Sequence, residues 1–185
     1  VEPDDRLNEL FFDLRLADTT DRVALAEVCR TVPTASSDDP YSSYFADLAD
    51  RMDNMNVAGH LTGSIDLVLR LDGPRFLVVD YKSNRAHPPG DPSWLDHYEE
   101  APLREEMVKH DYPLQAFLYS VALHRYLRWR LPDYDPSTHL AGSAYLFLRG
   151  MVGPPGTGGR TTGVTCWRPP IEAVLSADRI LAGDQ

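Results

Sequence analysis

Cysteine and long apolar runs are both scarce in this chain. It has 2 cysteines, Cys29 and Cys166, which lie far apart and lack the close spacing of metal-binding thiols. A four-cysteine iron–sulfur cluster is therefore excluded, and we expect both thiols to be reduced and structural. No run of about 18 apolar residues and no signal sequence is present, so we expect a soluble, cytoplasmic protein without a membrane span.

Two further features narrow the function. No Gly-x-x-x-x-Gly-Lys-Ser/Thr string occurs, and 185 residues leave no room for ATP-binding helicase domains, so any motor must lie elsewhere. Positive charge is also in deficit, with 18 Lys and Arg against 28 Asp and Glu and a formal net charge of −10. Because phosphate backbones attract basic surfaces, nucleic acid should bind this chain weakly and with a strong salt dependence. An acidic surface could equally face a protein partner.

Length and apolar content fit one domain over residues 1–185, since 43% of the residues are apolar and can form a sizeable core. Asp111 is placed to cap one helix, with Pro113 in its first turn. The Gly- and Pro-rich stretch within 150–163 predicts a flexible loop. Apolar periodicity predicts further elements, namely strands over 9–16, 64–71, 75–82 and 140–148 and helices over 20–32, 95–110 and 171–181.

The most informative feature is charge inside the hairpin of the two predicted strands over 64–71 and 75–82. Side chains alternate along a strand, so Asp80 and Lys82 share one face. If the turn between the strands has three residues, Asp66 lies opposite Asp80, with the two Cβ atoms roughly 5 Å apart. A turn of two residues would instead pair Asp66 with Val79 and put the aspartates on opposite faces. The interpretation therefore depends on the register.

Two facing carboxylates repel each other unless a cation, a shared proton or the lysine compensates. Mg²⁺ does this well, because it binds one or two carboxylates and completes its shell with water and phosphate oxygens. Lys82 could then orient a water or stabilise charge that develops on a phosphate. A buried Asp–Lys pair or a solvated sheet face is the commoner explanation of Asp-x-Lys taken alone.

Other strings accompany this hairpin and change that balance. The chain reads Gly63-Ser-Ile-Asp66, then Asp80-Tyr-Lys-Ser-Asn84, then Tyr112-Pro-Leu-Gln-Ala-Phe-Leu-Tyr119, and finally Ala144-Tyr-Leu-Phe-Leu-Arg-Gly150. In order and spacing these strings resemble the C-terminal nuclease domain of the RecB family, part of the PD-(D/E)xK superfamily. The resemblance implies a restriction-endonuclease-like α/β fold, a mixed sheet flanked by helices, which we place on both faces.

The resemblance also implies site residues. Asp66 and Asp80 would bind the metal together with the main-chain carbonyl of Tyr81, and Lys82 would be catalytic. Gln115 and Tyr119 would contact DNA, and their i, i+4 spacing puts them on one face of a helix. The implied cofactor is Mg²⁺, with Mn²⁺ as an alternative and Ca²⁺ as a non-catalytic substitute.

By the same resemblance the activity would be that of a deoxyribonuclease of the exodeoxyribonuclease V type. It would process single- and double-stranded DNA ends during double-strand-break repair and recombination. The implied partners are the RecC and RecD subunits, with RecA as a client loaded onto the product strand and no membrane involved.

One departure and two alternatives accompany this interpretation. RecB nuclease domains carry an upstream helix with a metal-binding histidine, which residues 1–60 do not match, so we expect that helix to be missing here and the metal site to be incomplete. Glu9 is a weaker acidic candidate, because exposed strand-end glutamates are common. His124 is expected to be a packed or surface residue, and Arg149 an ordinary surface residue.

Two alternative functions stay open. They are a non-catalytic DNA- or partner-binding module of the same fold and a free-standing nuclease.

Overall fold

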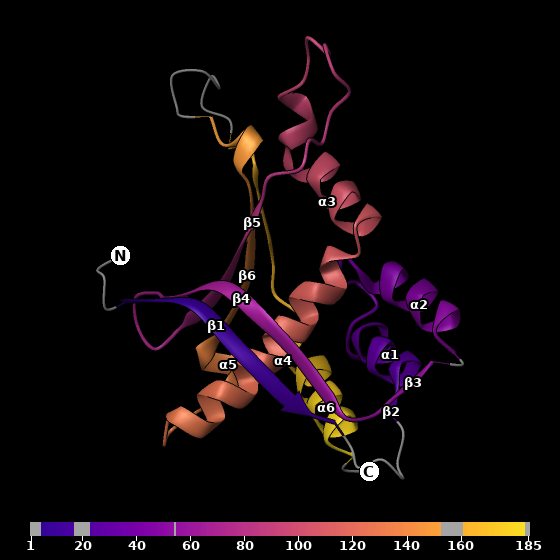
Figure 1. Ribbon diagram of the computed structural model, residues 1–185, viewed down its shortest axis with the longest axis vertical. Helices are drawn as coiled ribbons and strands as arrows, with labels where there is room; N and C mark the ends of the chain where they lie inside the picture. Colours follow the sequence, from indigo (N-terminus) through magenta and orange to yellow (C-terminus); the bar gives the residue numbers. More distant parts are fainter. Residues whose placement is uncertain (1–4, 17–22, 54, 153–160, 184–185) are drawn as a thin grey trace.

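A five-stranded mixed sheet forms the centre of the computed structural model, which describes residues 5–16, 23–53, 55–152 and 161–183 (Figure 1). The strand order is β1-β4-β5-β6-β7, with β5 and β6 parallel and the other neighbours antiparallel. The strands are β1 (Arg6–Arg15), β4 (His60–Arg70), β5 (Phe76–Lys82), β6 (Leu140–Phe147) and β7 (Val164–Trp167). A separate two-stranded sheet pairs β2 (Val23–Ala24) with β3 (Asn56–Val57). The predicted mixed α/β sheet is confirmed.

Helices are the other regular elements of the described residues. The α-helices are α1 (Leu25–Ala35), α2 (Ser42–Arg51), α3 (Glu100–Lys109), α4 (Tyr112–Arg130), α5 (Pro136–His139) and α6 (Ile171–Ala182), and two 3₁₀ turns are η2 (Asp96–Tyr98) and η3 (Leu148–Gly150). None of the described helices is long and apolar enough to cross a bilayer. The predicted helix over 20–32 begins in part outside the described residues, and the predicted loop over 150–163 lies mostly outside them.

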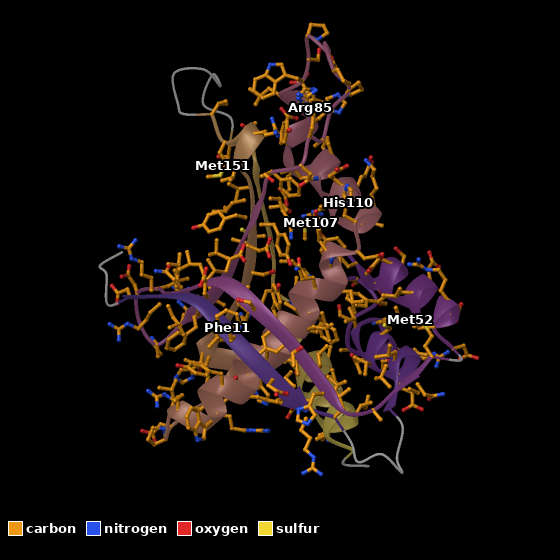
Figure 2. All side chains as sticks on the ribbon, viewed as in Figure 1. Phe11, Met52, Arg85, Met107, His110 and Met151 are labelled. Atoms are coloured by element: carbon orange, nitrogen blue, oxygen red, sulfur yellow. The ribbon has the colours of Figure 1, made fainter. Side chains whose placement is uncertain are left out.

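The helix α4 packs on the sheet through the residues that its apolar spacing selects. Phe117 and Val121 are fully buried, and Leu114 and Leu118 are partly buried against the same core. The helix α3 contributes Met107, which is 1% exposed and is labelled in Figure 2 between α3 and the strands. The core therefore lies between the sheet and the helices, as the amphipathic pattern predicts.

The predicted cap of α4 is wrong in its detail. Asp111 precedes the helix with a left-handed φ of 54°, and its side chain accepts no hydrogen bond from the first turn. Only two residues separate α3 from α4, and a short connection of this kind requires a left-handed residue, which aspartate tolerates. The carboxylate instead accepts a hydrogen bond from the hydroxyl of Tyr44 at 2.9 Å, and so ties α2 to the start of α4.

In the part of the chain that the structure describes, the helices cover one face of the sheet and not both. The main core joins buried helical residues to Val78 and Tyr145, which share a face with Asp80. The opposite face has its own small cluster around Leu67 and Val79, to which only strand residues contribute in the described part of the chain. Amphipathic spacing shows that a helix buries one side but not which face of the sheet it covers, which explains the error.

A buried acidic residue links the far half of α4 to α6. Asp178 of α6 accepts hydrogen bonds from Nε of Arg125 and, at 2.9 Å, from Nη1 of Arg128, both on α4. His124 also belongs to this cluster, with Nδ1 2.9 Å from the Tyr134 hydroxyl and Nε2 3.6 Å from Asp178. His124 is therefore a packed residue, as the sequence suggested.

Replacing Asp178 with alanine should lower the free energy of unfolding by roughly 3 kcal/mol, because it leaves the part-buried guanidinium of Arg125 without its partner. Burial alone would raise the pKa of Asp178, but His124, Arg125 and Arg128 outweigh it and lower that pKa. A carboxyl with a lowered folded-state pKa stabilises the fold above its unfolded pKa and loses this contribution as pH falls through the folded value. Chemical denaturation at neutral and acidic pH should show a difference between parent and variant that shrinks on acidification.

The matched control is Asp53→Ala, which removes the exposed pair that Asp53 forms with Arg30 at 2.8 Å. Exposed pairs of this kind contribute about 0 to 1 kcal/mol. Equal losses in the two variants would show that the Asp178 cluster has no special role in stability.

Candidate functional site

The hairpin of β4 and β5 has the register in which the two aspartates face each other. The amide of Leu71 donates a hydrogen bond to the carbonyl of Arg75 at 2.8 Å, which closes a three-residue turn. Leu67 pairs with Val79, which is the register of the three-residue turn, and the charge of Asp66 acts on Asp80 at the end of the paired segment. The amide of Tyr81 also donates to Oδ2 of Asp66 at 3.2 Å. The three-residue alternative is confirmed and the two-residue alternative is wrong.

The two carboxylates have different environments. Asp80 is 3% exposed, whereas Asp66 is exposed. Burial raises the pKa of Asp80, the contact with Lys82 opposes this rise, and the charge of Asp66 adds to it. Oδ2 of Asp80 lies 2.7 Å from Nζ of Lys82 and has no other polar partner among the described residues. A buried carboxylate oxygen with so little compensation is well suited to receive a cation.

Aromatic rings and an amide hold the ammonium group of Lys82. Its Nζ donates a hydrogen bond to Oε1 of Gln115 at 3.0 Å. The same atom lies 3.9 Å from the ring centre of Tyr112 and 5.2 Å from that of Tyr145. Cation–π contacts of this length attract the ammonium group and restrict its rotamers. The side chain of Lys82 is only 12% exposed, so its position is well defined.

A hydrogen-bonded chain extends from Lys82 along α4. The hydroxyl of Tyr145 donates to Oε1 of Gln115 at 3.1 Å, and Nε2 of Gln115 donates to the Tyr119 hydroxyl at 3.0 Å. Burial raises the pKa of Tyr119, and the charge of Asp80 raises it further. The hydroxyl therefore stays protonated as a donor at neutral pH. The structure thus brings Gln115 and Tyr119 to the hairpin residues with which the sequence grouped them.

Sequence reasoning missed Tyr112 and Tyr145 as parts of this site. Tyr145 lies beside Asp80 in the parallel pair of β5 and β6, and the rings of Tyr112 and Tyr145 stack with centres 5.8 Å apart. Both residues stand in the strings that carry the family resemblance. Their role was hidden because a sequence shows neither the parallel register nor which aromatic residues meet the lysine.

Glu9 and the histidines do not complete a metal cluster. Glu9 falls between the pairs of β1 with β4 so that it lies opposite Asp66, and it has a left-handed φ of 53°, but its side chain is exposed. His60 pairs with Asp13 at 2.5 Å, away from Asp80. Among the described residues no group of three or more His, Cys, Asp or Glu side chains is arranged to hold a metal ion.

The oxygen donors at the hairpin nevertheless fit a hard divalent cation. Asp66 and Asp80 offer two carboxylates, and Tyr81 adds a main-chain carbonyl at the same end of β5. Mg²⁺ commonly takes one or two carboxylates and leaves its other positions to water and substrate oxygens. A site of two carboxylates and a carbonyl therefore suits Mg²⁺ better than a site built from thiols or imidazoles.

Comparison with known proteins agrees with this geometry. The model of the PD-(D/E)XK nuclease superfamily matches residues 7–165. RecBCD enzyme subunit RecB of Mycobacterium tuberculosis (strain ATCC 25618 / H37Rv) is 45% identical over 190 residues, which cover 96% of this chain and 16% of that protein. RecB of Mycolicibacterium smegmatis is 43% identical over 78% of the chain and 14% of the relative, and RecB of Escherichia coli (strain K12) is 46% identical over 52% and 8%. The chain thus spans only a small part of each relative, and it belongs to the PD-(D/E)XK nuclease superfamily as a homologue of the RecB nuclease domain.

Proposed function

We propose that this domain hydrolyses DNA phosphodiester bonds with the help of a divalent cation, Mg²⁺ in the first place. The observation that carries the proposal is the pair of neighbouring aspartates at the end of the hairpin, Asp66 and the buried Asp80, with Nζ of Lys82 2.7 Å from Asp80. A purely structural Asp–Lys pair would not need a second carboxylate opposite it, since the extra negative charge weakens the sheet. The same group of residues serves phosphodiester hydrolysis well.

In this proposal Asp66, Asp80 and the carbonyl of Tyr81 hold the cation. When bound, Mg²⁺ or Mn²⁺ supplies positive charge beside the phosphate and acidifies a water molecule, whereas Ca²⁺ would occupy the site without supporting turnover. The water oxygen attacks phosphorus, the bond to one ester oxygen breaks, and that leaving oxygen takes up a proton. The water gives up its own proton to solvent or to a nearby base.

The side chains around the cation have separate tasks. Lys82 donates hydrogen bonds toward the reacting phosphate, where negative charge develops in the transition state. Gln115 positions Lys82, because its Oε1 accepts from Nζ at 3.0 Å. Tyr119, joined to the amide of Gln115 at 3.0 Å, presents a hydroxyl to the substrate strand. These contacts leave Lys82 little freedom to choose another position.

We further propose that the domain works within a RecBCD-like assembly. The matched relatives are named as RecBCD enzyme subunit RecB, so RecC-like and RecD-like subunits are the expected neighbours and RecA a client of the product strand. The net charge of −10 supports delivery of DNA by attached subunits, since an acidic domain captures free DNA poorly. The activity would then be of the exodeoxyribonuclease V type, in double-strand-break processing.

The test is cleavage of labelled single-stranded and duplex DNA by this chain with Mg²⁺, Mn²⁺, Ca²⁺ or EDTA, beside the Asp66→Asn variant. The expected result is cleavage with Mg²⁺ or Mn²⁺, none with Ca²⁺ or EDTA, and a large loss in the variant. Cleavage that persists in EDTA or is unchanged in Asp66→Asn would contradict the proposal. DNA binding without cleavage in every condition would favour the non-catalytic module.

A further inference from the structure

Arg149 lies at the same end of the sheet as the proposed site. Because β5 and β6 are parallel, Lys82 pairs with Phe147, and the chain then continues from each strand in the same direction. Two residues beyond Phe147, Nε of Arg149 donates a hydrogen bond to the carbonyl of Ser83 at 2.7 Å. Ser83 directly follows Lys82, so this bond fixes the guanidinium within one residue of the proposed catalytic lysine.

Figure 2 shows the surroundings of this contact. Arg85, two residues beyond Ser83, and Met151, two residues beyond Arg149, are labelled at the same end of the molecule. Arg149 itself is exposed, and Nε is its only side-chain atom with a hydrogen bond to a described residue. No described residue occupies the two Nη groups, so they can bind a ligand that approaches the carboxyl ends of β5 and β6, where ligands commonly bind in sheets with parallel strands.

No carboxylate of the described residues compensates the charge of Arg149. Within the described ranges, carboxylates neutralise much of the positive charge of the chain. The pairs are Arg30 with Asp53, Arg51 with Asp111, Arg70 with Asp5, Arg104 with Glu100, Lys109 with Glu106, and Arg125 and Arg128 with Asp178. Arg149 forms no ion pair with a described residue and is held by a neutral carbonyl instead. An anchored guanidinium with free Nη groups matches a phosphate bidentately.

We propose that Arg149 binds a backbone phosphate of the DNA strand next to the phosphate that is cleaved. The proposal rests on the proposed nuclease function and adds a residue that positions the strand. The bond to Ser83 holds the guanidinium in place before DNA arrives, so less side-chain entropy is lost on binding. In a domain with a net charge of −10, a local cation beside the site is what keeps the strand in register with Lys82.

The test compares Arg149→Gln with Arg75→Gln in binding of a fluorescent single-stranded oligonucleotide, with Ca²⁺ in place of Mg²⁺ to prevent cleavage. Arg75 is a matched control, because it too is exposed and donates from Nε to a backbone carbonyl, that of Asp72 at 3.4 Å, but at the opposite end of β5. We expect Arg149→Gln to weaken binding roughly tenfold, the value of one charged hydrogen-bonded contact. Arg75→Gln should bind like the parent chain.

The salt dependence separates a phosphate contact from a structural role. Loss of one phosphate contact to a single strand should make the slope of log affinity against log salt shallower by about 0.7. Arg149→Lys retains the charge, so it should keep the parental slope while losing part of the affinity. A variant that only disturbed the fold would shift its melting temperature and leave the slope unchanged.

Two results are decisive. If the parent chain shows metal-dependent cleavage but Arg149→Gln and Arg75→Gln bind alike with the same slope, the role of Arg149 is wrong and the nuclease proposal stands. If the parent neither binds nor cleaves DNA, the nuclease proposal fails and the role of Arg149 falls with it.

Discussion

The variant Asp80→Asn is expected to lose metal-dependent cleavage by a factor on the order of 10²–10³ or more, with Asp66 and Lys82 still in place. Asparagine has nearly the same shape but offers one neutral oxygen, so the cation loses the charged ligand on the buried side of the site. Single-turnover cleavage of a labelled single strand with Mg²⁺ measures the loss. The parent and the variant should be compared at several Mg²⁺ concentrations.

A second measurement on the same variant does not depend on cleavage. A cation that binds only the folded chain stabilises it by RT ln(1 + [L]/Kd), so Mg²⁺ or Ca²⁺ should raise the melting temperature of the parent. Burial raises the pKa of Asp80 in the metal-free chain, which shows that its negative charge is unfavourable there and that a cation would relieve it. Asp80→Asn should therefore lose most of the metal-induced rise in melting temperature.

The matched control is Asp72→Asn, in the turn at the other end of the same hairpin, where the side chain is exposed. It should retain both cleavage and the response to Mg²⁺. If Asp80→Asn cleaved at the parental rate, or if its melting temperature still rose with Mg²⁺ as the parent's does, Asp80 would not be a metal ligand.

The hairpin was predictable because its information is local. Runs of β-branched and aliphatic residues defined both strands, and Asp72-Gly73-Pro74 between them left two turn lengths, each with its own register. The structure chose between them through the hydrogen bond from Leu71 to Arg75 at 2.8 Å. The i, i+4 spacing likewise predicted that Gln115 and Tyr119 share a face of α4, and they are joined at 3.0 Å.

Features that depend on distant parts of the chain were not predictable from pattern alone. The strand β7 has four residues, Val164–Trp167, too few for alternation to be recognised. The helix α2 was hidden in a Ser- and Asp-rich stretch, although Phe45 and Leu48 are buried in the core. Tyr145 meets Asp80 only because β6 lies parallel to β5, and such a pairing leaves no local trace in a sequence.

The helix α1 shows how packing overrides a local signal. The helix predicted over 20–32 ends just before Pro33, and proline removes a backbone donor and disfavours a helical residue before it. The helix nevertheless continues to Ala35 and includes Pro33 in its last turn. Val32, the residue before the proline, is fully buried in the core. Burial of that side chain offsets the loss of one hydrogen bond near a helix end.

The variant Lys82→Met is expected to separate catalysis from metal binding. Cleavage should fall by a factor on the order of 10²–10³, because a donor to the charge of the transition state is removed. The oxygen ligands Asp66 and Asp80 remain, so Mg²⁺ should still raise the melting temperature. Both variants should lose cleavage, but Lys82→Met should keep the rise in melting temperature with Mg²⁺ that Asp80→Asn loses.

Without metal, the variant Lys82→Met should be less stable than the parent chain. Nζ of Lys82 lies 2.7 Å from the buried Oδ2 of Asp80, so methionine leaves that carboxylate without its counter-charge, at a cost of about 1–3 kcal/mol. Mg²⁺ then relieves a larger unfavourable charge, and the rise in melting temperature with Mg²⁺ should exceed the parent's. Lys109→Met is the control, since Lys109 also pairs with a carboxylate, Glu106 at 3.1 Å, but is 66% exposed and should change neither measurement much.

Cleavage and melting temperature of Lys82→Met, measured together, decide whether the lysine is catalytic or structural. If Lys82 is only structural, Lys82→Met should lower the stability in EDTA. Its cleavage should then equal that of the parent once the chain is folded and saturated with Mg²⁺. A catalytic Lys82 predicts that cleavage stays low at saturating Mg²⁺ even where the melting temperature has recovered. The contacts with Gln115 and Tyr112 at 3.0 and 3.9 Å hold the ammonium in one position. An ion pair with Asp80 alone would not require such a fixed position, whereas stabilisation of a developing charge on the substrate does.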